Sequence, residues 1–145
     1  MTLLTRFAPA VGRLLIAVIF LLSGFGKIAD PAMAQGYIAS AGLPLPLVAF
    51  LIAVAVELGG GTLLLVGYQT RLAALALAVF SVAAALGFHH DFADQNQMIH
   101  FLKDLAIAGG LLQVFAFGAG AFSLDARRGR GAARPPLNSP IAGLE

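Results

Sequence analysis

One carboxylate stands inside an otherwise apolar run, LIAVAVELGGGTLLLVG, at residues 51–67. Glu57 lies about ten residues into the apolar stretch that begins near Leu47, which at about 1.5 Å per residue places it roughly 15 Å deep in a membrane. An ionised group at that depth costs at least ~2.5–3.5 kcal/mol on insertion scales, so it faces the bundle interior and has a partner. The sequence therefore predicts a buried polar site around Glu57.

Candidate partners for Glu57 come from two other apolar stretches. Lys27 closes the first of them. The last one begins with MIHFLKDLAIAGG, which places His100, Lys103 and Asp104 within two helical turns. Spacings of three and four residues put these three side chains on one helical face. We expect all five residues to form one buried cluster, in which Lys103 is the preferred partner of Glu57 and Lys27 the second choice.

Protonatable groups in an apolar pocket suit proton exchange with a bound ligand. In this hypothesis Glu57 moves the proton, and Lys103 and His100 donate hydrogen bonds to ligand oxygens. The residues expected to contact the ligand as well are Lys27, Asp104, His90 and Gly60. An ion pair that only fixes the register of two helices is an interpretation that stays equally open.

A metal centre is not expected. His89, His90, Asp91 and His100 are the residue types that bind metals. However, adjacent histidines on one polar loop are usually solvated, and no second pair of ligands stands at helical spacing.

Composition decides that these residues lie in a membrane protein. The chain has 145 residues, of which 59% are hydrophobic and only 11% charged, against roughly 25% charged in soluble domains. A membrane-spanning helix needs roughly 20 mostly apolar residues. Four stretches qualify, at about residues 8–28, 47–67, 71–89 and 98–117. The predicted fold is all-α, a polytopic membrane four-helix bundle.

The rest of the chain leaves no room for a soluble domain. Residues 1–125 form the predicted bundle, and residues 126–145, rich in Gly, Pro and Arg, are predicted to be a flexible basic tail. Cysteine is absent, which excludes disulfides, thiolate nucleophiles and cysteine-ligated metals. The basic residues form no nucleic-acid motif, and beside a membrane they favour contact with anionic lipid head groups.

The distribution of Lys and Arg predicts the orientation. Of the nine basic residues, only Lys27 and Lys103 lie near one side of the bundle. The other seven lie on the side that holds both termini: Arg6, Arg13, Arg71, Arg127, Arg128, Arg130 and Arg134. Because basic loops stay in the cytoplasm, both termini are predicted to be cytoplasmic.

Three local features complete the topology. Residues 33–41 are predicted to form a short helix along the outer membrane surface, and HHDFADQNQ to close over the outer end of the bundle. Arg13 is expected to extend to the cytoplasmic surface. The AMAQ segment after the first stretch resembles a signal-peptidase site, but Lys27 and Asp30 before it favour an uncleaved first helix.

Three sequence segments carry a resemblance to a known family. GRLLIAVIFLLSGFGKIADP, VAVELGGGTLLLVGYQTRLAALALAVF and IHFLKDLAIAGGLLQ occur in this order, and GAGAFSLD closes the region at residues 118–125. This pattern resembles the DoxX family of small bacterial membrane proteins with four helices. The matching positions are Lys27, Glu57, Gly60, Arg71, His100 and Lys103, whereas Asp104 stands where many relatives have Asn.

The resemblance implies a multi-pass protein of the bacterial inner membrane, associated with redox or oxidative-stress systems. The family name derives from a subunit of a thiosulfate:quinone oxidoreductase. The first hypothesis is therefore a membrane subunit of a quinone-dependent oxidoreductase, with quinone as the one candidate cofactor. The alternatives are a small-molecule binding or transport protein and a membrane adaptor that anchors a soluble oxidoreductase. Membrane lipids and a second copy of the chain complete the expected partners.

Overall fold

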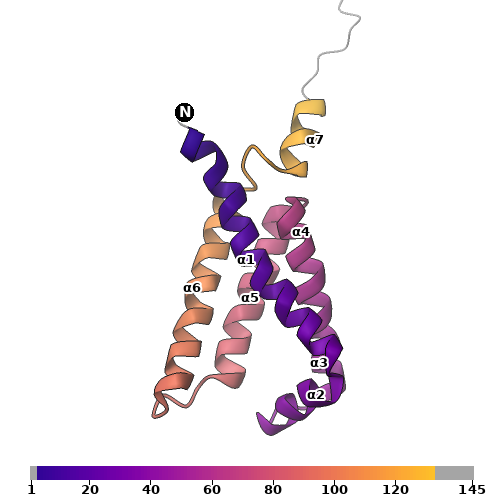
Figure 1. Ribbon diagram of the computed structural model, residues 1–145, viewed down its shortest axis with the longest axis vertical. Coiled ribbons are helices and arrows are strands. Elements are labelled where there is room, and N and C mark those ends of the chain that lie inside the picture. Colours follow the sequence, from indigo (N-terminus) through magenta and orange to yellow (C-terminus); the bar gives the residue numbers. More distant parts are fainter. Residues whose placement is uncertain (1–2, 133–145) are drawn as a thin grey trace, which may run out of the picture.

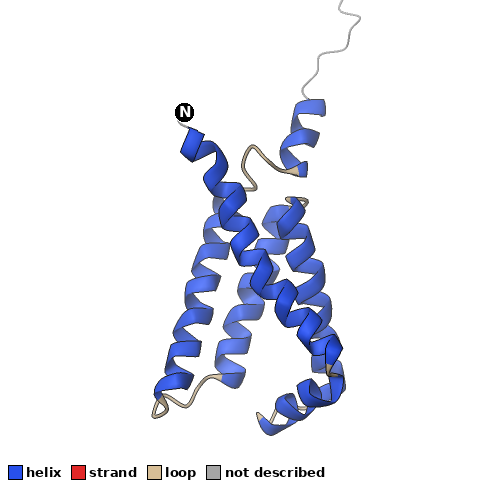
Figure 2. Ribbon diagram, in the orientation of Figure 1, coloured by secondary structure: helices blue, strands red, loops and turns tan. Residues whose placement is uncertain are grey.

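The computed structural model describes residues 3–132, and every secondary-structure element in that range is a helix (Figure 2). Four helical segments are long and apolar enough to cross a membrane, as the sequence predicted. Their bounds differ from those of the predicted spans by at most five residues. They are α1 (Leu3–Ala29), the composite segment Pro46–Val66, α5 (Thr70–Phe88) and α6 (Gln95–Phe117).

Figure 1 shows how the helices are arranged. Helix α1 runs obliquely across the bundle, while α5 and α6 form a closely packed antiparallel pair. The beginning of α1 and the last helix, α7 (Leu124–Ala132), lie at one end, called here the α7 end. Helix α2 (Pro31–Ser40) and the α5–α6 connection lie at the other, the α2 end. Both ends of the described chain therefore share one side, which an even number of spans requires.

The core is formed mostly by small and medium side chains from all four spans. Alanines allow the helices to approach closely, which lets packing contacts replace the hydrophobic force that is absent in lipid. Many large apolar side chains point outward instead, as expected for helices that contact lipid. The buried core residues are Ala17, Phe20, Leu64, Ala74, Leu77, Ala78, Ala108 and Leu111.

The short helix predicted at residues 33–41 is present as α2. Asp30 caps its N-terminus, because the Asp30 side chain accepts a hydrogen bond of 2.9 Å from the Met33 amide. Pro31 follows at the first helical position, where its missing N–H has no cost. Asp94 caps α6 in the same way, accepting from the amide of Asn96 at 2.7 Å.

The second span contains a feature that periodicity did not reveal. It is built from α3 (Pro46–Val54), the π-helix η1 (Ala55–Gly60) and α4 (Gly61–Val66). Such π turns are rare and occur frequently at functional sites. Glu57 lies within η1.

The predicted flexible tail begins as a helix. Residues 126–132 continue α7, and the remaining tail residues, 133–145, lie outside the described residues. Two side chains explain the helix. The Ser123 hydroxyl accepts from the Ala126 amide at 3.1 Å, and Asp125 places a negative charge in the first turn.

The side of the membrane on which the α7 end lies can be tested with single cysteines, since the chain has none. Ala93 lies exposed in the α5–α6 connection, and a side chain at Gly129 of α7 meets nothing within 4 Å. In intact spheroplasts a membrane-impermeant maleimide should label Ala93→Cys, and it should label Gly129→Cys only after permeabilisation. Labelling of both variants in intact cells would contradict the predicted orientation.

Candidate functional site

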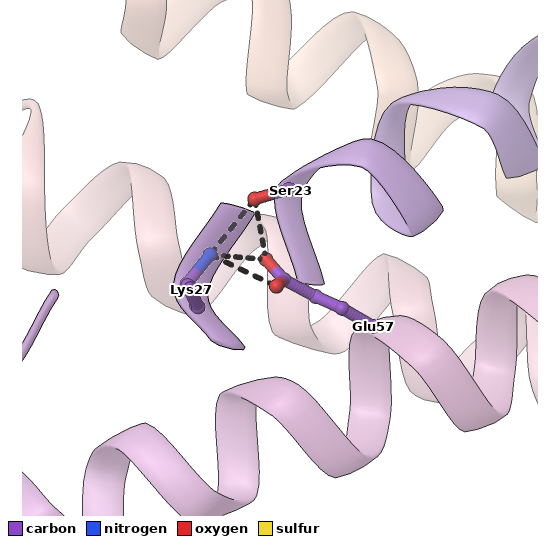
Figure 3. A network of polar contacts seen from close by, with 3 residues as sticks. All are labelled: Ser23, Lys27 and Glu57. Atoms are coloured by element: carbon purple, nitrogen blue, oxygen red, sulfur yellow. Dashed lines mark hydrogen bonds and ion pairs between the residues drawn. The ribbon is translucent and has the colours of Figure 1, made fainter. Parts of the chain in front are cut away.

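The carboxylate of Glu57 is buried between α1 and η1, with only 4% of the residue exposed. The ammonium of Lys27 lies 2.9 Å from its Oε1 and 2.8 Å from its Oε2. The Ser23 hydroxyl donates to Glu57 Oε1 at 3.0 Å and accepts from Lys27 Nζ at 2.8 Å. Figure 3 shows this closed triangle, which we call the Glu57 site. The expected interior position of Glu57 and its need for a partner are both met.

Local sequence explains why these three groups meet. Ser23 and Lys27 are four residues apart, so they share one face of α1. Between them, Gly24 lets α1 approach η1, because a Cβ at this position would lie 2.6 Å from Leu58 Cδ2. Lys27 lies two residues before the end of α1, and its long side chain reaches inward to Glu57. A quarter of the Lys27 side chain stays exposed, so the site is not sealed.

The preference for Lys103 as the partner of Glu57 was wrong. Lys103 is exposed on α6, whereas the Glu57 carboxylate is bound from α1 by Lys27. The physical reason is the packing order of the helices: α6 packs mainly against α5, and η1 packs mainly against α1. Sequence spacing showed the depth of each group but not which helices are neighbours.

Two other members of the predicted cluster, His100 and Asp104, belong to a second group near the α2 end, without Lys103. The rings of His89 and His100 stack with their centroids 5.0 Å apart. His89 Nε2 lies 3.9 Å from Asp104 Oδ2, and its Nδ1 lies 3.2 Å from Gln97 Oε1. We call these four residues the histidine cluster. The single cluster expected from the sequence is therefore two separate groups, one on α1 and η1 and one on α5 and α6.

Two predicted ligand contacts, His90 and Gly60, have different surroundings. His90 is exposed and lines a small cleft of about 220 Å³ with Tyr37 of α2 and Gln97 of α6. Gly60 faces α5, since a Cβ there would lie 2.9 Å from the Leu77 side chain. Nothing in these contacts tests the roles predicted for Glu57, Lys103 and His100, which stay predictions.

Across residues 3–132, no three His, Cys, Asp or Glu side chains gather closely enough to hold a metal ion. The rings of His89 and His100 do lie together. The carboxylate of Asp104, however, is 3.9 Å from His89 Nε2. This geometry suits stacked, hydrogen-bonded imidazoles rather than coordination.

Sequence reasoning missed a second buried cation. Arg13 is only 2% exposed, and its guanidinium donates to the backbone oxygens of Leu64 at 2.7 Å and Phe122 at 2.6 Å. It does not extend to the surface as expected, because these carbonyls accept hydrogen bonds from its two Nη atoms inside the bundle. Gly67, with φ +69°, makes room for it, since a Cβ there would lie 2.5 Å from both Arg13 Nη1 and Ser123 Cβ.

Asp125 adds further contacts to the group around Arg13. We call this group the Arg13 clasp (Arg13, Gly67, Phe122, Ser123 and Asp125). The amide of Asp125 donates to Gly67 O at 2.9 Å, and its carboxylate accepts from the amides of Gln69 and Thr70, both at 2.9 Å. Burial raises the pKa of the Asp125 carboxyl, but the two amides and Arg128 outweigh it and hold the pKa below its usual value. The carboxylate thereby compensates the positive N-terminus of α5.

The fold and the Glu57 site define a polytopic membrane protein of four helices with an ion pair inside the bundle. The DoxX family pattern matches residues 8–90, more than half of the chain. This chain belongs to the DoxX family.

Two curated relatives come from Escherichia coli (strain K12). The chain is 40% identical to the inner membrane protein YqjF over 118 residues, which cover 79% of this chain and 87% of YqjF. It is 34% identical to the inner membrane protein YphA over 123 residues, covering 81% and 87% of the two chains. No solved structure matches the chain. With its four apolar helices, the protein is a multi-pass protein of the inner membrane.

Proposed function

We propose that this protein is the membrane subunit of a quinone-linked redox system and that the Glu57 site exchanges protons with the bound quinone. The observation that carries the proposal is the ion pair of Glu57 and Lys27 inside an apolar bundle. Its carboxylate partner, Glu57, lies in the π-helix η1. Ionisable groups in spans mark functional sites by default, and π turns are frequent there. The family resemblance supports the quinone as the ligand class.

The Glu57 site fits a quinone head by its donor set. The quinone would supply the electron-accepting chemistry, and its carbonyl oxygens need N–H or O–H donors. Lys27 and Ser23 provide such donors next to a carboxylate that can carry a proton. With no cysteine in the chain, electrons come from a substrate or a partner protein.

The hydrogen bonds of the closed triangle suggest how proton and ligand are linked. Lys27 Nζ makes contacts with both carboxylate oxygens and with Ser23. A proton on Glu57 removes the negative charge and one of these acceptors, which frees a Lys27 N–H for a ligand oxygen. Protonation of Glu57 therefore favours ligand binding at Lys27, and loss of that proton returns Lys27 to the carboxylate.

The proposal is tested by extracting lipids from protein purified out of native membranes and identifying bound molecules by mass spectrometry. We expect a co-purifying quinone, with occupancy reduced at least about tenfold in Lys27→Met, as for the loss of one charge-assisted contact. Gln113→Leu, an exposed position on α6, is the matched control and should keep the quinone. Equal occupancy in all three proteins would contradict the proposal.

The cleft beside His90 favours a second candidate function, the binding of a small polar molecule. It lies at the α2 end and presents the polar side chains of Tyr37, Asp91 and Gln97. A polar metabolite in the same extracts would favour this function. A soluble oxidoreductase that co-purifies with a ligand-free protein would favour the adaptor role.

A further inference from the structure

A second cleft lies at the α7 end, where the beginning of α5 meets the chain that follows α6. Its volume is about 530 Å³, within the range of roughly 300–1,000 Å³ that is usual for ligand sites, whereas the cleft beside His90 is smaller. We call it the Arg71 cleft. Its lining residues are Gln69, Thr70, Arg71, Leu72, Gly118, Ala119 and Asp125.

Arg71 is the cation that this cleft offers to a ligand. The residue is exposed, and among residues 3–132 it forms no ion pair with an acidic side chain. Its guanidinium lies across the backbone at Gly118, where a Cβ would be 3.6 Å from Arg71 Nε. Gly118 has φ +82°, so a glycine is favoured here and the guanidinium stays close to the backbone.

The one acidic side chain in the lining is already compensated. Both oxygens of Asp125 accept backbone amides of Gln69 and Thr70, and Arg128 and Arg13 lie near enough to act on its charge. Two backbone amides at the start of α5 are thereby hydrogen-bonded to a side chain of the same protein. What the cleft presents to its surroundings is therefore the positive charge of Arg71.

Further cations are held around the cleft at the same end. Arg128 lies over the ring of Tyr68, 4.9 Å from its centroid, and donates to the Tyr68 hydroxyl at 3.0 Å. Arg6 lies 5.5 Å from the centre of the Phe122 ring, and Arg127 is exposed on α7. Figure 1 shows α7 and the beginning of α1 at this one end of the bundle. The field at this end is positive and attracts anions.

The neighbours of the cleft indicate that the anion comes from a lipid. Leu72, at the third position of α5, is 64% exposed, and Phe117, at the end of α6, is 81% exposed. Both are apolar: Leu72 itself lines the cleft, and Phe117 directly precedes the lining residue Gly118. A phospholipid whose phosphate contacts Arg71 could therefore lay its acyl chains along Leu72 and Phe117. Arg71 would then lie at the depth of the lipid head groups.

We propose that the Arg71 cleft binds the phosphate group of an anionic phospholipid. Arginine suits this ligand because its planar guanidinium binds phosphate oxygens in a bidentate way. The neighbouring arginines of α7 add attraction for the head group without defining the site. The inference is independent of the quinone-linked role of the Glu57 site.

The test titrates the full-length protein, in a zwitterionic detergent, with phosphatidylglycerol, phosphatidylcholine or inorganic phosphate, and counts bound lipid by native mass spectrometry. We expect phosphatidylglycerol to bind at least about tenfold more tightly than phosphatidylcholine, the effect of one strong charged contact. Arg71→Gln should remove most of this preference. The matched control Arg127→Gln makes the same charge change outside the cleft and should lower the affinity less than about threefold.

Three results would overturn the proposal: equal binding of the two lipids, equal losses in Arg71→Gln and Arg127→Gln, or displacement of the lipid by millimolar inorganic phosphate. The last would assign the site to free phosphate. If Arg71→Gln loses helicity by circular dichroism, Arg71→Lys takes its place. It keeps the charge but not the bidentate geometry, and a loss of several-fold is still expected. Unchanged affinity in a folded Arg71→Lys would then count against the site.

Discussion

Replacing Glu57 by Gln should lower the free energy of unfolding by about 3 kcal/mol, because Lys27 loses its counter-ion inside the bundle. Breaking a buried ion pair from one side typically costs about 3–5 kcal/mol. The lower part of that range applies because a quarter of the Lys27 side chain is exposed and Lys27 lies two residues before the end of α1. An unpaired ammonium there can extend toward the head groups. The change in the free energy of unfolding is measured in detergent, with circular dichroism to monitor unfolding.

Double variants distinguish the two possible partners of Glu57, which are Lys103 from the sequence and Lys27 from the structure. Glu57→Gln with Lys27→Met removes both charges and should return stability to within about 1 kcal/mol of the unmodified protein. Glu57→Gln with Lys103→Met should keep the full deficit, since Lys103 is exposed on another helix. Rescue by Lys103→Met instead would show that the pairing described here is wrong. Restored stability with restored function would favour a purely structural ion pair.

Replacing Arg13 by Leu should cost at least about 3 kcal/mol. Its guanidinium makes two short hydrogen bonds, to Leu64 O and Phe122 O, and bonds from a charged donor contribute about 1.5–3 kcal/mol each. The substitution also leaves two carbonyls without this donor. Arg13→Lys should be intermediate, because one ammonium cannot reproduce the fork that spans both acceptors.

Arg6→Leu is the matched control for Arg13→Leu, since both arginines lie on α1. Arg6 is exposed and lies over the Phe122 ring, a contact that contributes about 0.5–1 kcal/mol at such a site. If the two variants unfold at the same denaturant concentration, the Arg13 guanidinium reaches the surface and the Arg13 clasp does not hold the helices together.

The four spans could be predicted because lipid imposes a simple rule on sequence. Every spanning segment must be a long apolar helix, so composition alone located the four spans. The π-helical hydrogen bonding of η1 was not predictable. A π turn changes the hydrogen bonding of a few residues and leaves AVELGG as apolar and as rich in glycine as an ordinary helix.

The site was predicted in part, and the missing part concerns which helices are neighbours. The position of Glu57 within its apolar stretch predicted a buried acid, and its negative charge indicated two lysines as possible partners. Choosing Lys27 over Lys103 requires knowing that α1 and η1 touch. The available signal was Gly24 in SGFGK, three residues before Lys27. Arg13 was missed because its acceptors are backbone oxygens, which have no sequence signature. Gly67 and the GAGAFSLD segment were the only hints.

The Arg13 clasp also fixes an order of events during synthesis. Arg13 emerges early, but its partner Phe122 follows 109 residues later. At ~5–20 residues per second the interval is roughly 5–20 s. Throughout that time the first helix is in place without the contact that finally holds it, while the second span can already offer Leu64. The helix that is made first is thus the last to be locked, and only a chain translated past Phe122 can close the bundle.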